Sequence, residues 1–450
     1  MIRGMIDPNF LPHNSHLEDP AGFKDRDPQL RWLKTQYYVY RSPLLDQFPR
    51  IPGIYTLGGG RQIGKSTLLK QWMLELIESG VNPKALVFIS GEMISDHYAL
   101  YRILGDVLKA MPSAGLNYIF VDEVTYIKEW DKAIKYAADA GLFERSVLML
   151  TGSDLTLIQE ARMRFPGRRG KSDVINFHLF PLSFKESVLL KHSTLDVSAP
   201  DSIDVLFENF NNYLCHGGFL TAINEFSVNK TISIATLTTY SEWIRGDMLK
   251  RGKQEHFLRE IITSIIKRYG TQVSWNALSK DLSIDHPQTV ADYAAHLENM
   301  DTLFIQGALL EDKLTMAPKK AKKLFFADPF IFHALRSWIW PAQDPFKTQI
   351  QSILADPEQC SELVEACVVT HFRRFYPTYY IKAEGEVDIA YVDKNSFWPI
   401  EIKWTTQLRS KDLKQILKYP QGRIWAKTET KSKMQGIPVE PLPLALFLMG

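Results

Sequence analysis

The chain has 450 residues, a formal charge of +2 and a hydrophobic content of 45%. This hydrophobic content excludes an intrinsically disordered chain, and the near-neutral charge excludes a uniformly basic protein that coats nucleic acid. The length is sufficient for about three domains, each able to bury a core without disulfide bonds.

The cysteines and the apolar runs indicate a compartment. Cys215, Cys360 and Cys367 form no CxxC pair, which favours a reducing environment. The first residues are polar and rich in proline, unlike a signal peptide, and no run reaches the roughly 20 apolar residues of a membrane helix. We therefore expect a cytoplasmic protein without a membrane segment.

The N-terminal part of the chain predicts a loose arm followed by an α/β domain. Residues 1–28 are rich in Asp, Pro and His and are expected to be loosely attached. Up to residue 181, short apolar runs then alternate with helical patterns. The candidate strands are 53–57, 85–89, 118–121 and 147–150. Because strands buried on both faces belong to parallel sheets, this alternation predicts an α/β layer fold.

A glycine-rich loop joins the first candidate strand to an amphipathic helix. Its residues are Gly59, Gly60, Arg61, Gln62, Ile63, Gly64, Lys65, Ser66 and Thr67. This is the GxxxxGK[ST] pattern, in which backbone N–H groups at a helix N-terminus surround phosphates. Lys65 is expected to reach the β- and γ-phosphates of ATP, and the Ser66 hydroxyl to bind Mg²⁺. The alternative is an ordinary glycine-rich turn.

Two acidic residues end the third candidate strand. Asp122 and Glu123 follow the run Tyr118–Val121, which places them at the carboxyl edge of the sheet, where ligands bind. Asp122 is expected to hold the Mg²⁺ shell, and Glu123 to polarise the attacking water. The alternative is a solvated strand end.

Hydroxyl and basic residues follow the fourth candidate strand. Thr151 or Ser153 could sense the γ-phosphate, although Ser153 could equally cap a helix. A dense basic group comes next, formed by Arg162, Arg164, Arg168, Arg169 and Lys171. Arg168 or Arg169 could act as an arginine finger, in cis or from a neighbouring subunit. The alternative is a solvated or phosphate-contacting face.

In this order, the segments GGGRQIGKST, IFVDE, LMLTGS, FPGRRG and HLFPLSFKE resemble a family of bacterial and archaeal AAA-type ATPases with a C-terminal nuclease-like domain. Residues 213–219 also resemble the lid signature of that family, although Leu220 replaces its proline. The resemblance implies a P-loop ATPase core at 29–181, a helical lid at 182–252, a winged helix-turn-helix at 253–326 and a PD-(D/E)XK nuclease-like domain at 345–450.

Residues 256–326 show three helical patterns followed by a hairpin, an order similar to a winged helix-turn-helix. The outward residues of the third helix would be Gln288, Thr289, Asp292 and His296. That face is not basic, so reading of DNA bases has weak support, and a structural role between domains is an equal alternative. The basic run 319–323 either contacts phosphates or forms a solvated loop.

A second constellation lies near the C-terminus. If residues 393–396 form a hairpin loop with Val392 opposite Phe397, Asp388 lies opposite Glu401. Alternation then places Asp388, Glu401 and Lys403 on one face. Carboxylates so close repel unless a cation such as Mg²⁺ or Mn²⁺ lies between them, and Lys403 would steady the nucleophile or the developing charge.

This arrangement resembles the PD-(D/E)XK nuclease core, with Asp388, Glu401 and Lys403 in the metal-binding and catalytic places. The family also has a helical glutamate, which Glu365 matches best, with Glu362 as the rival. The alternative is a relic site or a surface hairpin with a cross-strand ion pair. A local basic stretch follows the site: Arg409, Lys411, Lys414, Lys418, Arg423 and Lys427.

The sequence therefore predicts an Mg²⁺-dependent ATPase coupled to a DNA-associated C-terminal module that could cut DNA. One alternative is a nucleotide-dependent switch or scaffold with an inactive, partner-binding nuclease-like domain. Another is a winged-helix DNA-binding regulator. The expected partners are ATP and DNA, the latter through local basic patches. A homo-oligomer would supply an arginine finger in trans.

Overall fold

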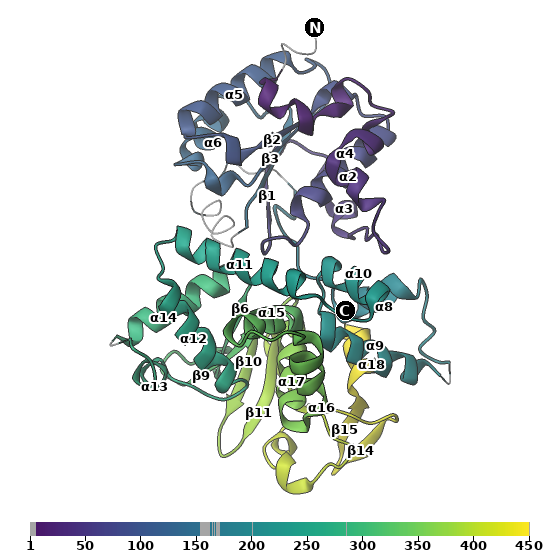
Figure 1. The fold of residues 1–450 in the computed structure, drawn as a ribbon, viewed down its shortest axis with the longest axis vertical. Coiled ribbons are helices and arrows are strands. Elements are labelled where there is room, and N and C mark those ends of the chain that lie inside the picture. The colour runs from purple at the N-terminus through teal and green to yellow at the C-terminus, as the bar shows by residue number, and fades with distance from the viewer. Residues whose placement is uncertain are drawn as a thin grey trace. The chain divides into compact units, whose positions relative to one another are not determined.

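The computed structural model describes residues 6–153, 163, 165, 167, 172–199, 201–284 and 286–449. The chain forms two compact units that divide between Phe180 and Pro181 (Figure 1). The first unit contains a five-stranded sheet, and the second contains a six-stranded sheet and two small two-stranded ones. No helix in these described ranges is long and apolar enough to cross a membrane.

The first unit is built on a parallel sheet with the strand order β2-β3-β4-β1-β5. Its strands are β1 (Gly53–Gly58), β2 (Leu86–Ser90), β3 (Asn117–Asp122), β4 (Ser146–Thr151) and β5 (Asn176–His178). The first four contain or overlap the apolar runs that predicted them, and their side chains are almost wholly buried. The expected parallel α/β arrangement is confirmed.

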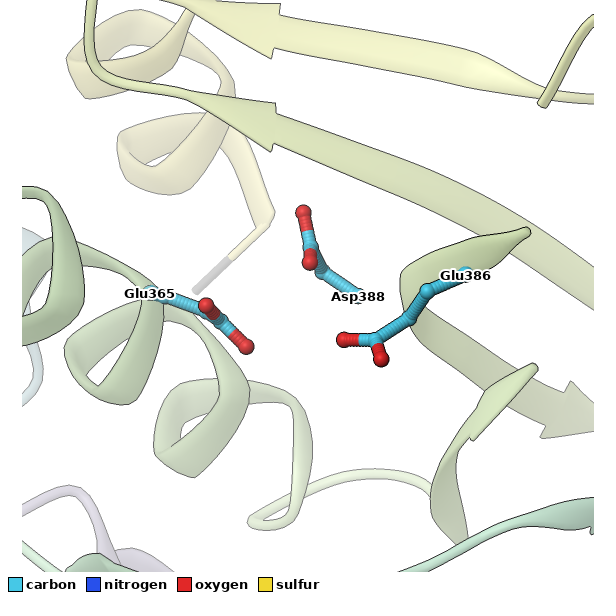
Figure 2. Close-up of side chains that lie close together, drawn as sticks. All are labelled: Glu365, Glu386 and Asp388. Atoms are coloured by element: carbon cyan, nitrogen blue, oxygen red, sulfur yellow. The ribbon is translucent and has the colours of Figure 1, made fainter. Parts of the chain in front are cut away.

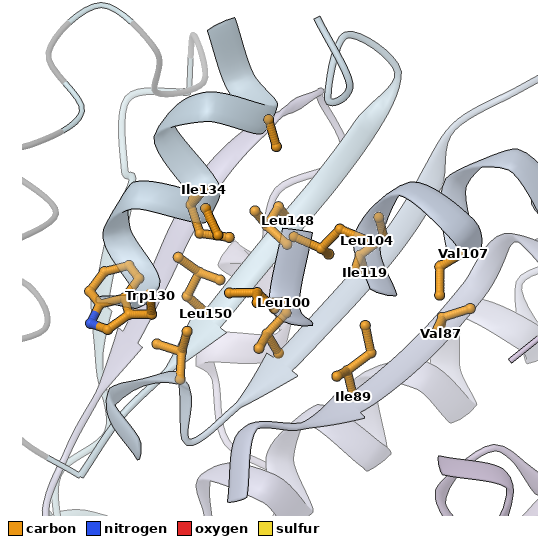
Figure 3. Close-up of a cluster of buried hydrophobic side chains, with 14 of the residues drawn as sticks. Val87, Ile89, Leu100, Leu104, Val107, Ile119, Trp130, Ile134, Leu148 and Leu150 are labelled. Carbon is orange, nitrogen blue, oxygen red and sulfur yellow. The ribbon is translucent and has the colours of Figure 1, made fainter. Parts of the chain in front are cut away.

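Helices cover both faces of this sheet, as expected for apolar parallel strands. They are α4 (Lys65–Glu78), α5 (His97–Ala110) and α6 (Trp130–Asp139). Apolar side chains of α5 and α6 pack on one face, against Val87, Ile119 and Leu148 (Figure 3). The apolar stripe of α4 packs on the other face, where Trp72 makes edge contacts with the rings of Tyr118 and Phe120.

The N-terminal segment packs against the core, so the expectation of a loose arm is wrong for residues 6–28. Phe10, Leu17 and Phe23 are buried. Asn14 bonds the edge strand β2 through both ends of its amide, donating to Phe88 O at 2.7 Å and accepting from Phe88 N at 2.8 Å. This amide occupies backbone groups at a sheet edge that would otherwise stay unpaired.

Short helices form this segment and several of the connections between strands of the first unit. They are η2 (Pro8–His13), η3 (Ser15–Leu17), α1 (Phe23–Arg26), α2 (Pro28–Leu33), α3 (Leu44–Gln47), η4 (Pro83–Ala85), η5 (Gly91–Met93) and η6 (Val124–Tyr126). Asp27 caps α2 and also lies 3.1 Å from the Lys70 ammonium of α4. Both side chains are fully buried, so a buried ion pair ties the N-terminal segment to the helix that follows the glycine-rich loop.

The second unit begins with helices, as the sequence predicted for residues 184–251. These are α8 (Phe184–Lys191), α9 (Ser202–His216), α10 (Leu220–Asn229) and α11 (Ile234–Lys250). The turn between α9 and α10 contains Gly217 and Gly218. A Cβ on Gly218 would lie 2.1 Å from Leu182 O, and the Gly218 N–H donates to Asp328 at 2.8 Å. These glycines therefore serve close backbone packing.

Three helices and paired strands follow. They are α12 (Glu255–Lys267), α13 (Trp275–Lys280), α14 (Pro287–Asn299), β6 (Leu303–Gly307), β7 (Leu309–Leu310), β8 (Thr315–Met316) and β9 (Lys322–Phe326). The predicted inner face of α14, which includes Val290, Tyr293 and Leu297, is buried. Strand β9 pairs antiparallel with β6 and contains Lys322 and Lys323, so these two lysines do not lie in a solvated loop.

The C-terminal sheet has the order β10-β11-β12-β13-β15-β14. Its strands are β10 (Thr378–Lys382), β11 (Glu386–Asp393), β12 (Ser396–Lys403), β13 (Arg423–Ala426), β14 (Ser432–Met434) and β15 (Ile437–Pro441). Strands β11 and β12 form the predicted antiparallel hairpin, in which Val392 pairs with Phe397. The register that the argument assumed is therefore confirmed as far as the pair of Ile389 with Ile400, which are the neighbours of Asp388 and Glu401.

Helices of the same unit pack on this sheet and on α9. They are α15 (Pro329–Ile339), the π-helix η7 (Phe346–Ile350), α16 (Gln351–Ala355), α17 (Pro357–Phe372), η8 (Ser410–Leu413), η9 (Ile416–Lys418) and α18 (Leu442–Met449). Helix α17 packs against β11 and β9, and its first turn is capped by Asp356. This packing places the acidic residues of α17 beside the two strands.

Candidate functional site

The glycine-rich loop connects β1 to α4, and two of its glycines have backbone conformations that other residues rarely adopt. Gly59 has a φ of +150°, and a Cβ on it would lie 2.5 Å from Leu179 O. Gly64 has a φ of +101° and immediately precedes the first residue of α4. The loop can therefore approach a ligand closely with its backbone.

Lys65 bridges the loop from the start of α4. Its buried ammonium donates to Gly59 O and Gly60 O, both at 3.0 Å, and lies 3.7 Å from Glu123 Oε1. The predicted phosphate-binding lysine and the predicted water-polarising acid are thus neighbours.

Asp122 organises the end of β3. The Ser66 hydroxyl donates to Asp122 Oδ2 at 2.5 Å, and the Thr151 hydroxyl donates to Asp122 Oδ1 at 2.5 Å. Thr151 also accepts from the Glu123 N–H at 2.9 Å. The structure therefore brings together the two predicted Mg²⁺ ligands, Ser66 and Asp122. It also shows that Thr151 holds both acids in place.

Glu123 has an uncommon backbone conformation and a buried carboxyl group. It has a left-handed φ of +50° directly after the strand. Burial raises the pKa of its carboxyl, and the neighbouring Lys65 opposes this rise. Its Oε2 atom is buried and has no hydrogen-bond partner among the described residues. Such an orphaned oxygen is available to a water molecule or to a ligand.

These residues line one cavity of about 300 Å³. Its lining includes Arg61, Gln62, Gly64, Lys65, Ser66, Thr67, Asp122 and Glu123. Its size, its backbone donors and its cluster of oxygen ligands fit a nucleotide with Mg²⁺.

Several lining residues were not found from the sequence: His13, Gln29, Phe88, Ser90, Glu92 and Tyr126. His13 comes from the N-terminal segment that was expected to be loose, and Gln29 directly follows that segment. The Gln29 Oε1 atom is buried and unpaired within the described part of the chain. No local signal marks His13 and Gln29, because the long-range pair of Asp27 with Lys70 and the contacts of Asn14 bring them to the site.

Two other predictions for this site stay open. Ser153 is half-buried just beyond β4, and residues 154–162, where the capped helix was expected, lie outside the described residues. Arg162, Arg164, Arg168, Arg169 and Lys171 also lie outside them, so the arginine-finger hypothesis stays a prediction.

A second cluster of ionisable groups lies in the C-terminal unit. Glu365 projects from α17 towards Glu386 and Asp388 on β11 (Figure 2). One carboxylate oxygen of each residue lies within 4.8 Å of those of the other two. The sequence argument named Glu365 and Asp388 and missed Glu386, although period-2 alternation places Glu386 on the same face as Asp388.

Lys323 of β9 lies among these three acids. Its ammonium is 2.7 Å from Glu365 Oε1 and 3.7 Å from Asp388 Oδ1, and it forms a short ion pair with Glu386. Only 2% of the Lys323 side chain is exposed. Burial lowers the pKa of Lys323, but Glu365, Asp388 and Glu386 outweigh this effect and raise the pKa overall.

Glu401 and Lys403 form the neighbouring part of the cluster on β12. Lys403 Nζ lies 2.5 Å from Glu401 Oε1, and Asp388 Oδ2 accepts from the Ile402 N–H at 2.8 Å. Burial raises the pKa of Glu401, and the nearby Asp388 raises it further. The predicted trio of Asp388, Glu401 and Lys403 is thus brought together.

The other predicted helical acid, Glu362, makes no ion pair in the described part of the structure and is absent from the three-carboxylate group. Burial raises the pKa of Glu362 to about 7. Of the two rivals on α17, Glu365 is therefore the one that contacts the cluster.

The carboxylate cluster does not fit a divalent ion as it stands. A Mg²⁺ ion would need to contact carboxylate oxygens at about 2.0–2.1 Å, and the Lys323 ammonium already lies between the oxygens of Glu365, Glu386 and Asp388. The geometry is that of a buried multiple ion pair.

The outward face of α14 does not offer a basic surface. Asp292 pairs with Lys253 and lies 3.4 Å from His296 Nε2. Five basic residues after β12 are exposed: Arg409, Lys414, Lys418, Arg423 and Lys427. Two of these are paired, Lys418 with Glu384 and Arg423 with Glu440, and the Lys411 side chain lies outside the description.

Comparisons with known proteins agree with the geometry of the first site. Residues 52–188 match a family described as AAA domain, and residues 207–341 match a domain of unknown function, DUF8612. An uncharacterized protein of Haemophilus influenzae is 24% identical over 267 residues, which are 57% of this chain and 62% of that protein. An uncharacterized protein of Methanocaldococcus jannaschii is 24% identical over 197 residues, which are 38% of this chain and 41% of that protein.

The chain thus spans less than two thirds of the length of the curated relatives that it matches. Among solved structures, the Walker-type ATPase paby2304 of Pyrococcus abyssi aligns with a TM-score of 0.42 and 15% identity. That alignment covers 63% of this chain and 91% of the other. The match over residues 52–188, together with the parallel sheet and the phosphate loop, identifies the first unit as a P-loop ATPase domain of the AAA type.

Proposed function

We propose that the chain is a Mg²⁺-dependent ATPase whose C-terminal unit associates with DNA. The observation that carries the ATPase part is the shared cavity of Lys65, Ser66, Asp122 and Glu123, in which the Glu123 Oε2 atom is buried without a partner among the described residues. These are the groups that phosphoryl transfer from ATP to water requires.

Each residue has a separate task in this proposal. Lys65 exchanges the carbonyls of Gly59 and Gly60 for the β- and γ-phosphates of ATP. Ser66 and Asp122 would hold Mg²⁺, which neutralises phosphate charge when bound. Glu123 orients the attacking water and accepts its proton, and its raised pKa suits a group that must take up a proton.

The first test is the Lys65→Ala variant. We expect loss of ATP binding, because Lys65 is the ammonium at the centre of the loop. The matched control is Lys84→Ala, since Lys84 is an exposed lysine of the same unit. Fluorescent-nucleotide titration measures the affinity, and undiminished ATP turnover in Lys65→Ala would contradict the assignment.

The DNA-associated part of the proposal has two supports. The β10-β11-β12 strands with α17 carry acids in the order of a PD-(D/E)XK core, and exposed basic residues follow β12. The three helices α12–α14 with the β6–β9 pair also have the element order of a winged helix. We expect DNA binding that weakens as salt rises, and charge reversal at Arg409 and Lys414 should reduce the slope of this dependence.

A second candidate is a nucleotide-driven switch whose nuclease-like unit does not cut. The Lys323 ammonium inside the carboxylate cluster favours it, because this cation already satisfies the acids. Comparing DNA cleavage with Mg²⁺ or Mn²⁺ by the wild type and Asp388→Ala separates the two candidates. Cleavage that Asp388→Ala abolishes supports a nuclease, and absence of cleavage in both proteins supports the switch.

The oligomeric part of the proposal depends on the arginine finger. A hydrolysing AAA-type site needs such a residue, from the same chain or from a second copy. If a second copy supplies it, ATP turnover per chain should rise with protein concentration.

A further inference from the structure

The most unusual group in the C-terminal unit is the buried lysine inside its acidic cluster. Lys323 is 2% exposed, and its ammonium contacts Glu365 and Glu386 and lies 3.7 Å from Asp388. Figure 2 shows the side chains of Glu365, Glu386 and Asp388, which lie close together. A buried ammonium with this number of acidic neighbours has the role that a metal ion has in an acidic site, since both cations neutralise carboxylates that cannot stay charged together.

The lysine is held in place by regular secondary structure. It belongs to β9, whose ladder with β6 pairs Lys323 with Gln306. Gln306 is fully buried, and its Nε2 donates to the backbone oxygen of Asp388 on β11 at 2.9 Å. The next residues of β9, Leu324 and Phe325, are buried in the core. Lys323 therefore cannot leave the cluster without disturbing the β6–β9 pair.

Three of the polar contacts around the cluster come from one segment of the chain. Lys323 and Gln306 reach it from β9 and β6, and Gln272, which precedes α13, bonds Glu386 through its side-chain amide. All three contacts fall within residues 253–326, the segment with the winged-helix order. This segment thus supplies the cation, a hydrogen bond to the Glu386 carboxylate and a hydrogen bond to the backbone of Asp388.

We infer that Lys323 is the resident cation of the carboxylate cluster of Glu365, Glu386 and Asp388, so that the C-terminal unit holds these acids without a divalent metal. The inference deepens the proposed function and rests on the nuclease-like arrangement of α17, β11 and β12. It assigns the unit a non-cutting role, because activation of water for attack on a phosphodiester would require the ion that Lys323 replaces.

Mn²⁺ binding to the nucleotide-free protein tests this inference, with electron paramagnetic resonance measuring the free ion. The proteins compared are the wild type, Asp388→Asn, Lys323→Gln and the double variant Lys323→Gln/Asp388→Asn. The matched control is Lys322→Gln, because Lys322 is the preceding residue of β9 and contacts Pro318 O and Lys320 O instead of the acids. The ATPase site is common to all five proteins, so differences report on the cluster.

We expect the wild type, Asp388→Asn and Lys322→Gln to bind equal amounts of Mn²⁺. Lys323→Gln should bind about one additional equivalent, and the double variant should lose it. Mn²⁺ binding by the wild type that Asp388→Asn removes would overturn the inference, as would the absence of additional binding in Lys323→Gln.

Lys323→Gln could unfold in metal-free buffer, since it leaves acids buried without a cation. In that event, near-ultraviolet circular dichroism gives the answer. Recovery of the folded signal by Mn²⁺, but not by NaCl of equal ionic strength, supports the inference, and failure of Mn²⁺ to restore the signal overturns it.

ATP turnover, measured in parallel, separates this inference from the proposed ATPase activity. Absence of turnover in the wild type would remove the ATPase proposal and leave the Mn²⁺ result unaffected. DNA cleavage by the wild type that Asp388→Asn abolishes would retain a nuclease and overturn the resident-cation inference.

Discussion

At the scale of single residues, Thr151 links the two acids of the nucleotide site. Its hydroxyl donates to Asp122 and accepts from the Glu123 N–H, and the residue is fully buried at the end of β4. The sequence suggested Thr151 only as a sensor of phosphate. The hydrogen bonds favour a positioning role, because one hydroxyl contacts both the Asp122 carboxylate, the proposed Mg²⁺ ligand, and the backbone of Glu123, the proposed water-polarising residue.

The Thr151→Val variant tests this role. Valine keeps the shape and removes the hydroxyl, so Asp122 Oδ1 and the Glu123 N–H lose a partner at a cost of about 1–3 kcal/mol in unfolding free energy. We expect kcat for ATP hydrolysis to fall by about 10²-fold with little change in KM. A fall in stability with unchanged kcat would contradict a positioning role in catalysis.

Much of this site could be predicted from the sequence, because its residues lie in short, contiguous sequence patterns. The loop, Lys65, Ser66, Asp122 and Glu123 lie in short patterns whose strand and helix context fixes their position. Lys323, His13 and Gln29 could not be found in this way, because contacts between segments distant in sequence bring them to their sites. Lys323 in particular occurs in a basic run that resembles a solvated loop.

At the scale of secondary-structure elements, a buried ion pair attaches the N-terminal segment to α4. Asp27 lies 3.1 Å from the Lys70 ammonium, which also donates to His13 O and lies 3.9 Å from the centre of the Phe88 ring. Burial lowers the pKa of Lys70 to about 8, and Asp27 opposes this shift. The attachment brings His13 and Gln29 to the nucleotide cavity.

The Asp27→Asn variant tests this attachment. Removing one partner of a fully buried pair leaves an uncompensated charge, so we expect the unfolding free energy to fall by about 3–5 kcal/mol. The control is Asp25→Asn in the same segment. The Asp25 pair with Lys34 is exposed to solvent, so its loss should change the unfolding free energy much less. Urea unfolding that gives equal losses for both variants would contradict the account.

The contact between α15 and α9 should make the unfolding free energy depend on pH. His333 of α15 is fully buried, with its Nε2 atom 2.9 Å from Leu214 O of α9. Burial lowers its pKa to about 4, with the Leu214 hydrogen bond opposing the shift. The folded protein therefore holds His333 neutral at pH values where an unfolded chain, with a His pKa of about 6.5, takes up a proton.

The sign of this effect follows from proton uptake by the unfolded state. The contribution of His333 is complete above pH ~6.5 and is lost as the pH falls towards about 4. We expect the wild type to lose roughly 3 kcal/mol relative to His333→Gln over this interval. Urea unfolding of both proteins at several pH values measures the difference, and a difference that is independent of pH would contradict a buried neutral histidine.

At the scale of the whole molecule, the chain consists of two compact units with separate sheets. The sequence predicted the parallel sheet of the first unit and the β11–β12 hairpin of the second, because both have strong periodic patterns. It divided residues 182–450 into a lid, a winged helix and a nuclease-like domain. The structure joins these segments in one unit through long-range contacts such as those of Lys323 with Glu365 and of Gly218 with Asp328.

Ligand binding should distinguish the two units. Because the described residues that line the proposed nucleotide cavity all belong to the first unit, we expect ATP with Mg²⁺ to raise the midpoint of one unfolding transition and leave the other unchanged. Differential scanning calorimetry of the full chain measures both transitions. Equal stabilisation of both by ATP, or loss of this stabilisation in Lys84→Ala, would contradict the assignment of the site to the first unit.

The central claim is that Glu123 activates water for ATP hydrolysis in the cavity formed with Lys65 and Asp122. The most direct test is the rate of ATP hydrolysis by Glu123→Gln at saturating ATP and Mg²⁺, together with its ATP affinity. We predict that affinity remains close to that of the wild type while kcat falls by about 10²–10⁴-fold, because glutamine cannot accept the proton. A Glu123→Gln protein that hydrolyses ATP at the wild-type rate would contradict the account.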